Sequence, residues 1–377
     1  MINREIDRGK IIELQSLFPI TAILGARQCG KTTLAKSFDY DHFFDLENPR
    51  HLAMFENPQL TLENLEGCIV IDEIQRVPEL FPLLRYLVDT NSSQRYLILG
   101  SASTELIRQS SESLAGRIAY YHLGGLRLED TKGESLEKHW FRGGFPKSFT
   151  AGSEKESNLW RENYIRTFLE TDIPQLGIKI PSRTLRSFWT NLSHYHGQVI
   201  NFSEIGRNFG MSDMTIRKYI DILEGTFMVS ILRPWFSNTK KRLVKRPKIY
   251  IRDSGIFHSL QGMGSHKELL THPKLGASWE GFAFESVKQI LGKRDEDFYF
   301  WSTHSGAEID LFWQNSGKNY GIEFKFSDAP RLTKSMQSAA NDLSLEKLWV
   351  IYPGSDSYKL AKNIDVLPLK GAIASLK

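Results

Sequence analysis

Residues 20–33 read ITAILGARQCGKTT. The first five are apolar apart from one threonine, which is typical of a buried strand, and the glycine that follows opens a turn. Gly25, Gly30, Lys31 and Thr32 complete the pattern G-x-x-x-x-G-K-[ST], in which backbone N–H groups surround phosphates. Because a helical pattern follows Lys31, the stretch predicts a strand, a phosphate-binding loop and a helix, in that order.

This loop predicts binding of a nucleoside triphosphate, and we expect ATP with Mg²⁺. The Lys31 ammonium group is expected to reach the β- and γ-phosphates, and the Thr32 hydroxyl to bind Mg²⁺. The alternative is a glycine turn with a chance lysine, which the complete motif between strand and helix disfavours. The expected nucleotide-binding residues are Gly25, Ala26, Arg27, Gln28, Cys29, Gly30, Lys31, Thr32 and Thr33.

A second apolar run, residues 68–71, ends in Asp72 and Glu73. A strand that ends beside the phosphate loop delivers a carboxylate to the metal, so we expect Asp72 to hold Mg²⁺. Glu73 is then placed to act as the general base that polarises the attacking water. The alternative is an acidic pair that merely opens the next helix, and the phosphate loop upstream disfavours it.

Two further polar residues are candidates for the chemistry of phosphoryl transfer. Ser101 follows the apolar run 96–100, where its hydroxyl can report the γ-phosphate, although a simple helix cap explains it equally well. Arg117 precedes the apolar run 118–123 and can stabilise transition-state charge in its own subunit or in a neighbouring one. The alternative for Arg117 is a surface arginine that pairs with an acid.

The apolar runs of the first part of the chain alternate with helical patterns. Such continuous apolar strands predict an α/β fold with a parallel sheet that carries helices on both faces. These runs are residues 20–24, 42–46, 68–72, 96–100 and 118–123.

Composition narrows the class of protein. The 377 residues fit two or three domains, and the net charge of +4 does not by itself indicate a nucleic-acid partner. No apolar run is long enough to cross a bilayer, so we expect a cytoplasmic protein without membrane contact. The two cysteines, Cys29 and Cys68, do not suit a disulfide, which agrees with a reducing compartment.

Short motifs spread over nearly the whole chain resemble one family. The sequence is similar to the prokaryotic ATPases of the AAA+ superfamily that carry a C-terminal domain of unknown function. This resemblance implies an ATPase core, a winged-helix-like middle and a C-terminal domain similar to the PD-(D/E)XK nucleases. The motifs are GARQCGKTT at 25–33, IDEIQR at 71–76, GSAS at 100–103, LAGR at 114–117, GGFP at 143–146, RPKIY at 246–250, DSG at 253–255 and WEGFAFE at 279–285.

The middle of the chain contains a helix–turn–helix outline. A serine-capped helix at 202–210 precedes a second helix at 214–224, whose apolar stripe has helical spacing. The second helix and the basic hairpin after it can contact DNA, while a lid, a protein contact or a solvated basic face are the alternatives. The residues expected to meet DNA are Thr215, Arg217, Lys218, Lys240, Lys241 and Arg242.

The last part of the chain collects acidic residues and a lysine in the order of a PD-(D/E)XK site. Asp310 and Glu323 lie on successive strand patterns and can share a divalent metal, with Glu280 on the preceding helix completing its ligands. Lys325 shares a strand face with Glu323 and can orient or deprotonate a water. The alternatives are an edge strand with a Glu–Lys pair, and a nuclease fold that is retained only for binding.

We therefore expect three domains: an ATPase domain at 1–125, a helical and winged-helix-like region at 126–260, and a nuclease-like domain at 261–377. One hypothesis for function is an ATP-driven enzyme that processes DNA with a metal-dependent nuclease site. The second is a regulatory or signalling ATPase that binds DNA or protein without cleaving it. A homo-oligomer is possible in both, and a purely structural scaffold conflicts with the intact phosphate loop.

Overall fold

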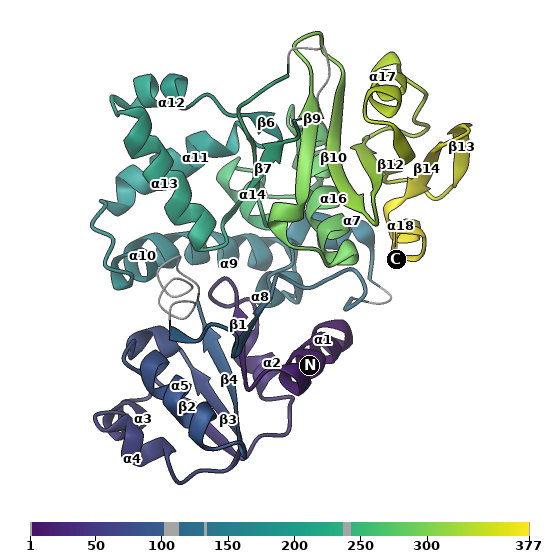
Figure 1. The fold of residues 1–377 in the computed structure, drawn as a ribbon. Coiled ribbons are helices and arrows are strands. Elements are labelled where there is room, and N and C mark those ends of the chain that lie inside the picture. The colour runs from purple at the N-terminus through teal and green to yellow at the C-terminus, as the bar shows by residue number, and fades with distance from the viewer. Residues whose placement is uncertain (1, 102–112, 132–133, 237–242, 377) are drawn as a thin grey trace. The chain divides into compact units, whose positions relative to one another are not determined.

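The computed structural model contains two compact units, each described here by itself (Figure 1). Unit 1 consists of Met1–Lys132, Gly144–Pro146 and Gly225–Phe227. Unit 2 consists of Gly133–Gly143, Lys147–Glu224 and Met228–Lys377. The structure describes residues 2–101, 113–131, 134–236 and 243–376.

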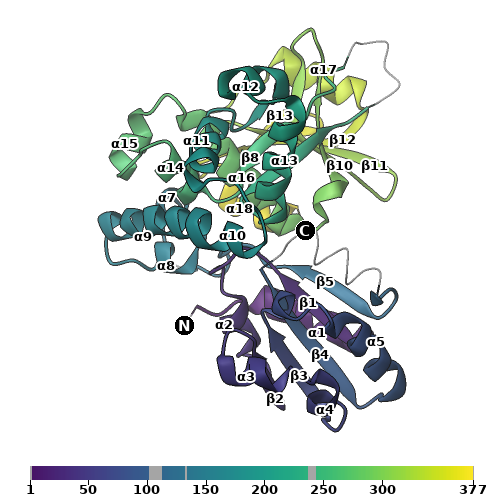
Figure 2. The same cartoon turned by 90° about the vertical axis from the view of Figure 1, so that its left-hand side faces the viewer.

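Unit 1 is built on a five-stranded sheet in the order β2-β3-β4-β1-β5, in which all neighbouring strands run parallel (Figure 2). This confirms the α/β sheet expected from the alternation of apolar runs and helical patterns. The strands are β1 (Ile20–Leu24), β2 (His42–Asp45), β3 (Gly67–Asp72), β4 (Gln94–Gly100) and β5 (Ile118–His122). The helices that flank it are α1 (Glu5–Leu17), α2 (Lys31–Ala35), α3 (Pro49–Met54), α4 (Pro58–Leu62), α5 (Leu80–Thr90) and a 3₁₀ turn, η1 (Ile74–Arg76).

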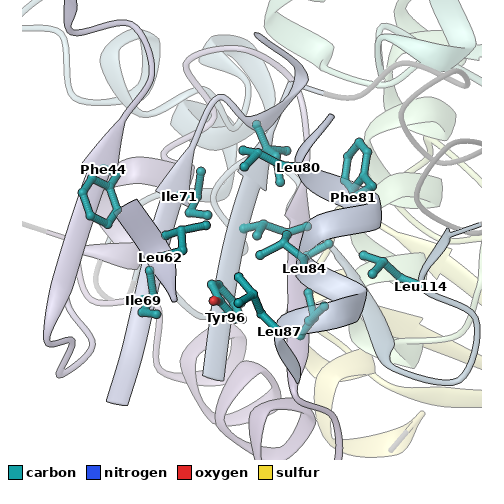
Figure 3. Packing of buried hydrophobic residues seen from close by; sticks show 14 of the residues in the cluster. Phe44, Leu62, Ile69, Ile71, Leu80, Phe81, Leu84, Leu87, Tyr96 and Leu114 are labelled. Carbon is teal, nitrogen blue, oxygen red and sulfur yellow. The ribbon is translucent and has the colours of Figure 1, made fainter. Parts of the chain in front are cut away.

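The core of unit 1 lies between the sheet and helix α5 (Figure 3). Leu80, Leu84 and Leu87 repeat at helical spacing, so one face of α5 is apolar and fully buried. They belong to the same cluster as Ile69 and Ile71 of β3. Each such side chain contributes roughly 1.5–3 kcal/mol on burial. This packing fixes the end of β3, where Asp72 stands.

Unit 2 combines a helical region with a second sheet. The helices from residue 136 onward are α7 (Leu136–Arg142), α8 (Pro146–Phe149), α9 (Glu154–Thr167), a π-helical turn η2 (Phe168–Asp172), α10 (Ile173–Gln175), α11 (Ser182–Ser193), α12 (Phe202–Phe209), α13 (Asp213–Gly225), α14 (Ser254–Leu260), α15 (His266–Thr271), α16 (Leu275–Leu291), a 3₁₀ turn η3 (Asp295–Asp297), α17 (Lys334–Asp342) and α18 (Leu369–Ser375). Among the described residues, no helix combines the length and apolar character needed to span a membrane.

The sheet of unit 2 has nine strands in the order β13-β14-β12-β11-β10-β9-β7-β8-β6. Its strands are β6 (Gln198–Val199), β7 (Val229–Pro234), β8 (Lys248–Ile251), β9 (Phe298–Ser302), β10 (Glu308–Asn315), β11 (Lys318–Phe324), β12 (Leu345–Tyr352), β13 (Tyr358–Ala361) and β14 (Ile364–Pro368). Strand β7 pairs in parallel with β9, so the sheet runs across residue 261, where the sequence suggested a boundary. Its hydrogen bonds therefore join the middle of the chain to the C-terminal part.

Helices α12 and α13 form the helix–turn–helix outline. Gly210, with φ +61°, ends α12 in a left-handed conformation that glycine adopts without strain. A Cβ atom at Gly206 would lie 2.6 Å from the Met211 carbonyl oxygen, so only glycine allows the two helices to turn this closely. The apolar stripe expected on α13 is buried, and the opposite face of this helix is exposed to solvent.

Candidate functional site

The loop between β1 and α2 needs its glycines for steric reasons. A Cβ atom at Gly25 would lie 2.3 Å from the carbonyl oxygen of Leu123, at the end of the neighbouring strand β5. Gly30 has φ +106°, a backbone conformation that is unfavourable for any residue with a Cβ atom. Gln28 also has a positive φ, +63°, although it is not glycine. Such strain is typical of loops that hold a ligand.

Lys31 is 5% exposed, yet its ammonium group is bound by neutral partners. Its Nζ atom donates hydrogen bonds to the carbonyl oxygens of Gly25 and Ala26, both at 3.0 Å. Within the described part of the chain, no carboxylate forms a salt bridge with Lys31. The loop therefore holds a buried positive charge that is balanced only partly, which suits the binding of phosphates. Arg27 of the loop pairs instead with Glu47, at 2.6 Å.

Thr32 and Asp72 lie together at the ends of α2 and β3. The Thr32 hydroxyl donates a hydrogen bond of 2.7 Å to Oδ2 of Asp72, whose side chain is almost fully buried. Burial raises the pKa of Asp72, and the hydrogen bond from Thr32 opposes this rise. A hydroxyl and a carboxylate are the hard oxygen donors that Mg²⁺ prefers, so these residues fit the expected ion.

Glu73 adopts a left-handed conformation, with φ +56° and ψ +44°, directly after β3. This backbone turns its carboxylate toward two polar side chains. Oε2 of Glu73 accepts hydrogen bonds from the Gln75 amide and, at 3.3 Å, from the Ser101 hydroxyl. The same Gln75 nitrogen donates to the Ser101 oxygen at 3.0 Å. The structure thus brings Ser101 to Glu73, and it adds Gln75, which sequence reasoning did not single out for a role.

Arg117 is not brought to the phosphate loop of its own chain. Its carbonyl oxygen accepts a hydrogen bond from the N–H of Ile20, so it lies beside the first residue of β1, whereas the loop follows the last. These two points are roughly 16 Å apart along the strand. The guanidinium group of Arg117 makes two hydrogen bonds, of 2.6 and 2.8 Å, to the carboxylate of Asp89. Within one chain, Arg117 is therefore a surface arginine that pairs with an acid, which was the alternative to a catalytic role.

The candidate residues of unit 2 lie together, at the ends of α16, β10 and β11. The Lys325 ammonium group is 2.6 Å from Oε1 of Glu323. Asp310 is buried, and its Oδ2 atom accepts a hydrogen bond of 3.0 Å from the N–H of Phe324. The side chains of Glu280 and Glu323 both interact electrostatically with Asp310.

Sequence reasoning missed the residue at the centre of this cluster, Lys248 of β8. Its side chain is 4% exposed, and its Nζ atom lies 3.1 Å from Oδ1 of Asp310 and 3.7 Å from Oε1 of Glu280. It also forms a salt bridge with Glu308. The hydroxyl of Tyr250, two residues along the same strand, donates to Oε1 of Glu280 at 2.8 Å. We refer to the group Lys248, Glu280, Glu308, Asp310, Glu323 and Lys325 as the carboxylate–lysine cluster.

Two carboxyl groups of this cluster have strongly raised pKa values. Burial, together with the charge of Asp310, raises the pKa of Glu280 to about 7 and that of Glu323 to about 8. At neutral pH the cluster therefore holds part of its charge balance as protons, and the two lysines supply the rest.

The divalent metal expected from the sequence does not fit this arrangement. Both oxygens of Asp310 are engaged, one by Lys248 and the other by the Phe324 N–H. Among the described residues, no group of three or more His, Cys, Asp or Glu side chains is arranged to hold a metal ion. The residues expected to share the metal, Asp310 and Glu323 with Glu280 as a third ligand, therefore do not fit it in this arrangement, because the Lys248 ammonium group already stands between Asp310 and Glu280.

Comparisons with known proteins divide the sequence in three. Residues 17–131 match an AAA domain, residues 133–267 match a domain of unknown function, DUF8612, and residues 275–371 match another, DUF4143. Two uncharacterized proteins, Mb2031c of Mycobacterium bovis and Rv2008c of Mycobacterium tuberculosis, are each 44% identical over 354 residues, covering 93% of this chain and 80% of the relative.

The chain belongs to the family of ATPases that join an AAA domain to DUF4143. Among solved structures, it is similar to the Walker-type ATPase PABY2304 of Pyrococcus abyssi, with a TM-score of 0.47 and 15% identity over 69% of this chain and 96% of that one. The fold of this AAA–DUF4143 protein is assigned from its own strand order and from the geometry of its phosphate loop.

The residues expected to meet DNA are only partly accessible in this AAA–DUF4143 protein. Lys218 and Arg217 are both exposed, and the guanidinium group of Arg217 lies 3.9 Å from the centre of the Phe202 ring. The Thr215 hydroxyl is hydrogen-bonded to that of Ser212, at 3.0 Å. The three basic residues of the hairpin, Lys240, Lys241 and Arg242, lie outside the described residues.

A further residue that sequence reasoning missed is Arg4, just before α1. Its buried guanidinium group donates to the carbonyl oxygens of Cys29, Gly124 and Gly125 at 3.1, 3.0 and 2.8 Å. Cys29 belongs to the phosphate loop, so Arg4 ties the loop to the end of β5. The signal was local, since Arg4 and Asp7 are charged residues one turn apart on the face of α1 that also buries Ile11.

The charge of Arg4 is balanced within the protein. Asp7, at 1% exposure, accepts hydrogen bonds from Nε of Arg4 at 2.7 Å and from Nε of Arg127 at 2.9 Å. Tyr121 of β5 donates its hydroxyl to the same carboxylate. A buried charge with several partners of this kind is held in a fixed position, and it fixes the loop with it.

Proposed function

We propose that this chain binds ATP with Mg²⁺ at residues 25–33 and hydrolyses it. The observation that supports this most directly is the hydrogen bond between Thr32 and Asp72 beside the partly balanced charge of Lys31. Lys31 and Thr32 begin helix α2, which follows β1, and Asp72 ends β3 of the same parallel sheet, so all three lie at the strand ends where ligands bind in open α/β folds. Membership of the AAA–DUF4143 family supports the same reaction class.

Each residue has a defined task in this mechanism. Lys31 turns from its two carbonyl partners to the β- and γ-phosphates, while Thr32 and Asp72 hold the metal. Mg²⁺, when bound, neutralises charge on the phosphate oxygens. Glu73 accepts a proton from the attacking water, and its hydrogen bonds from Gln75 and Ser101 set the direction of its carboxylate. Ser101 is thus a positioning residue in this proposal.

The test compares Lys31→Ala and Glu73→Gln with the unchanged protein. Lys31→Ala is expected to abolish ATP binding in calorimetry, and Glu73→Gln to keep binding while turnover falls by about 10²–10⁴-fold. Lys36→Ala, an exposed lysine five residues further along, is the matched control and should change neither. Turnover by Glu73→Gln at the rate of the unchanged protein would remove Glu73 from its role as base.

A second proposal concerns unit 2, which we infer acts on DNA under the control of ATP. It is supported by the helix–turn–helix outline of α12 and α13 with Lys218 exposed, and by the adjacency of Asp310, Glu323 and Lys325. Cleavage of DNA and binding without cleavage are the two forms of this role. Cys29 and Cys68 both have free thiols, which agrees with a reducing compartment and supports a cytoplasmic site of action.

Duplex, single-stranded and branched DNA distinguish these forms when each is offered with Mg²⁺ or Mn²⁺, with and without ATP. Cleavage that disappears in Lys325→Ala and persists in Lys318→Ala would establish a nuclease. Binding without cleavage, weakened by Lys218→Glu, would establish the regulatory form. If no DNA is bound under any of these conditions, the role on DNA is wrong and the ATPase proposal is unaffected.

A further inference from the structure

The carboxylate–lysine cluster contains its own cation, and that cation comes from a distant part of the chain. Lys248 lies on β8, whereas its acidic partners lie on α16 and β10, up to 62 residues further along. Its ammonium group contacts three carboxylates, those of Glu280, Glu308 and Asp310. A single buried ammonium group with three acidic partners occupies the position in which a divalent cation would bring such carboxylates together.

A second observation shows that one carboxyl oxygen of the cluster has no donor of its own. Oε2 of Glu323 is buried and has no hydrogen-bond partner among the described residues, although its other oxygen binds Lys325. Glu323 as a whole is 6% exposed, so water does not replace the missing partner freely. A buried carboxyl oxygen without a partner is costly, and only a cation that replaced Lys248 and the proton of Glu323 would satisfy it.

Lys248 is held firmly enough to exclude a competing ion. Its side chain passes over the ring of Phe300, with Nζ 5.5 Å from the ring centre, and the Tyr250 hydroxyl on the same strand donates to the same Glu280 oxygen that Lys248 contacts. The backbone of Lys248 pairs with β6 and with β7, in register with Val199 and Leu232. A divalent ion would have to displace an ammonium group that the sheet itself positions.

We propose that Lys248 is an internal substitute for a divalent cation, which closes the carboxylate–lysine cluster to Mg²⁺ and Mn²⁺. The proposal concerns occupancy of the cluster and stands apart from ATP hydrolysis. It deepens the proposed role on DNA, because a cluster closed to divalent metal ions favours binding of DNA without cleavage.

The test measures Mn²⁺ binding to the full-length chain without nucleotide, by the loss of the electron paramagnetic resonance signal of free MnCl₂. All variants also carry Asp72→Asn, which removes the expected metal ligand of unit 1. The protein with Lys248 intact is expected to bind no Mn²⁺ at millimolar concentration, and Lys248→Met to bind one ion at least about tenfold more tightly. Lys248→Arg, which keeps a cation in place, should behave like the parent.

A thermal melt supplies a second, independent readout. All eight tryptophans lie in unit 2, so their fluorescence follows the melting of that unit alone. Saturating Mn²⁺ should raise the melting temperature of Lys248→Met by at least about 3 °C and leave the parent unchanged. Adding Glu323→Gln to Lys248→Met should cancel the shift, because the unpartnered oxygen would then be an amide.

The outcomes separate cleanly. Tight Mn²⁺ binding by the parent that Glu323→Gln removes would overturn the proposal, as would a folded Lys248→Met that takes up no Mn²⁺. A Lys248→Met protein that folds only when Mn²⁺ is present would support it, and Lys248→Gln serves in the same test if the Met variant does not fold at all. ATP turnover of Lys248→Met in a chain with Asp72 restored reports on unit 1 separately, so failure here leaves the ATPase proposal standing.

Discussion

Lys31 in unit 1 and Lys248 in unit 2 are both buried lysines, but their charges are balanced in opposite ways. Lys31 donates to two backbone carbonyls, which neutralise little of its charge. Lys248 contacts three carboxylates, two of them within 3.1 and 3.7 Å and the third in a close salt bridge. The first arrangement leaves a positive charge that an anionic ligand can balance, whereas in the second the charge is already balanced by carboxylates of the protein.

This difference teaches that the residue types of a site do not decide whether it is ready for a ligand. Both regions contain a lysine, carboxylates and strand ends. The buried charge of Lys31 makes no salt bridge and interacts with Asp72 only at longer range, so an anionic ligand stabilises it further, while a balanced cluster gains nothing comparable. Charge balance therefore distinguishes a site prepared for binding from one that is closed, and four predictions test this comparison.

The largest effect is expected from Lys248→Met. Removing one partner of a buried ion cluster leaves the others unpaired, and we expect the free energy of unfolding of unit 2 to fall by about 3–5 kcal/mol. Urea denaturation followed by tryptophan fluorescence measures this. Lys318→Met, which removes an exposed lysine paired with Glu346, is the control and should leave the midpoint unchanged. Equal midpoints for the two variants would contradict the comparison.

The next effect is a loss of stability of unit 2 as the pH rises from about 6.5 to 8.5. The Glu323 carboxyl, with its pKa raised to about 8 by burial and by Asp310, stays protonated longer in the folded than in the unfolded chain. The folded state thus binds more protons in this range, so stability falls with increasing pH, by about 2 kcal/mol. The buried His196 and His258 are neutral in the folded chain and partly protonated in the unfolded chain near pH 6.5, so they oppose this fall in stability up to about pH 7.5.

The matched variants are Glu323→Gln, which should reduce this pH dependence to the smaller part carried by Glu280 with its pKa of about 7, and the exposed Glu346→Gln, which should keep all of it. Urea midpoints at a series of pH values provide the measurement. A slope in Glu323→Gln as steep as in the unchanged protein would show that Glu323 does not carry the proton linkage.

A smaller effect is expected from Arg4→Met in unit 1. The loss of three hydrogen bonds to loop and strand carbonyls should loosen the phosphate loop and weaken binding of a non-hydrolysable ATP analogue by about tenfold. Calorimetric titration measures this affinity. Arg8→Met, an exposed arginine one turn along α1, is the control. If both variants bind alike, Arg4 has no positioning role for the nucleotide.

The smallest effect is expected from Arg117→Ala. Arg117 pairs with Asp89 at the end of the sheet away from the phosphate loop. Turnover by isolated chains should therefore not change when Arg117 is replaced. We propose that any role in phosphoryl transfer requires a second copy of the chain, in which case turnover per chain rises with protein concentration only while Arg117 is present. Reduced turnover in Arg117→Ala at high dilution would show that it acts within its own chain.

The sequence alone was sufficient for the phosphate loop, because its signal is short-range. Gly25, Gly30, Lys31 and Thr32 fall within eight consecutive residues, and their spacing already requires a strand, a tight loop and a helix. The parallel sheet followed for the same reason, since strands buried on both faces are continuously apolar. Asp72 could be placed beside the loop because parallel strands end at one edge.

Pairings between distant residues depended on the tertiary structure. The order of strands brings β8 next to the acids of α16 and β10, and nothing in the local pattern around Lys248 shows which carboxylates it will meet. The same applies to Arg4, whose acceptors at Gly124 and Gly125 lie 120 and 121 residues away. It also applies to Arg117, which pairs with Asp89 because it lies at the end of the sheet where β1 begins.

The amino-acid sequence by itself thus determined which groups are present, where the phosphate loop forms, and the class of fold that carries it. Only the tertiary structure decided how the buried charges are balanced: Lys31 by carbonyl dipoles, and Lys248 by carboxylates. The physical reason is that local sequence fixes backbone conformation, whereas electrostatic balance depends on distances between groups that folding alone brings together.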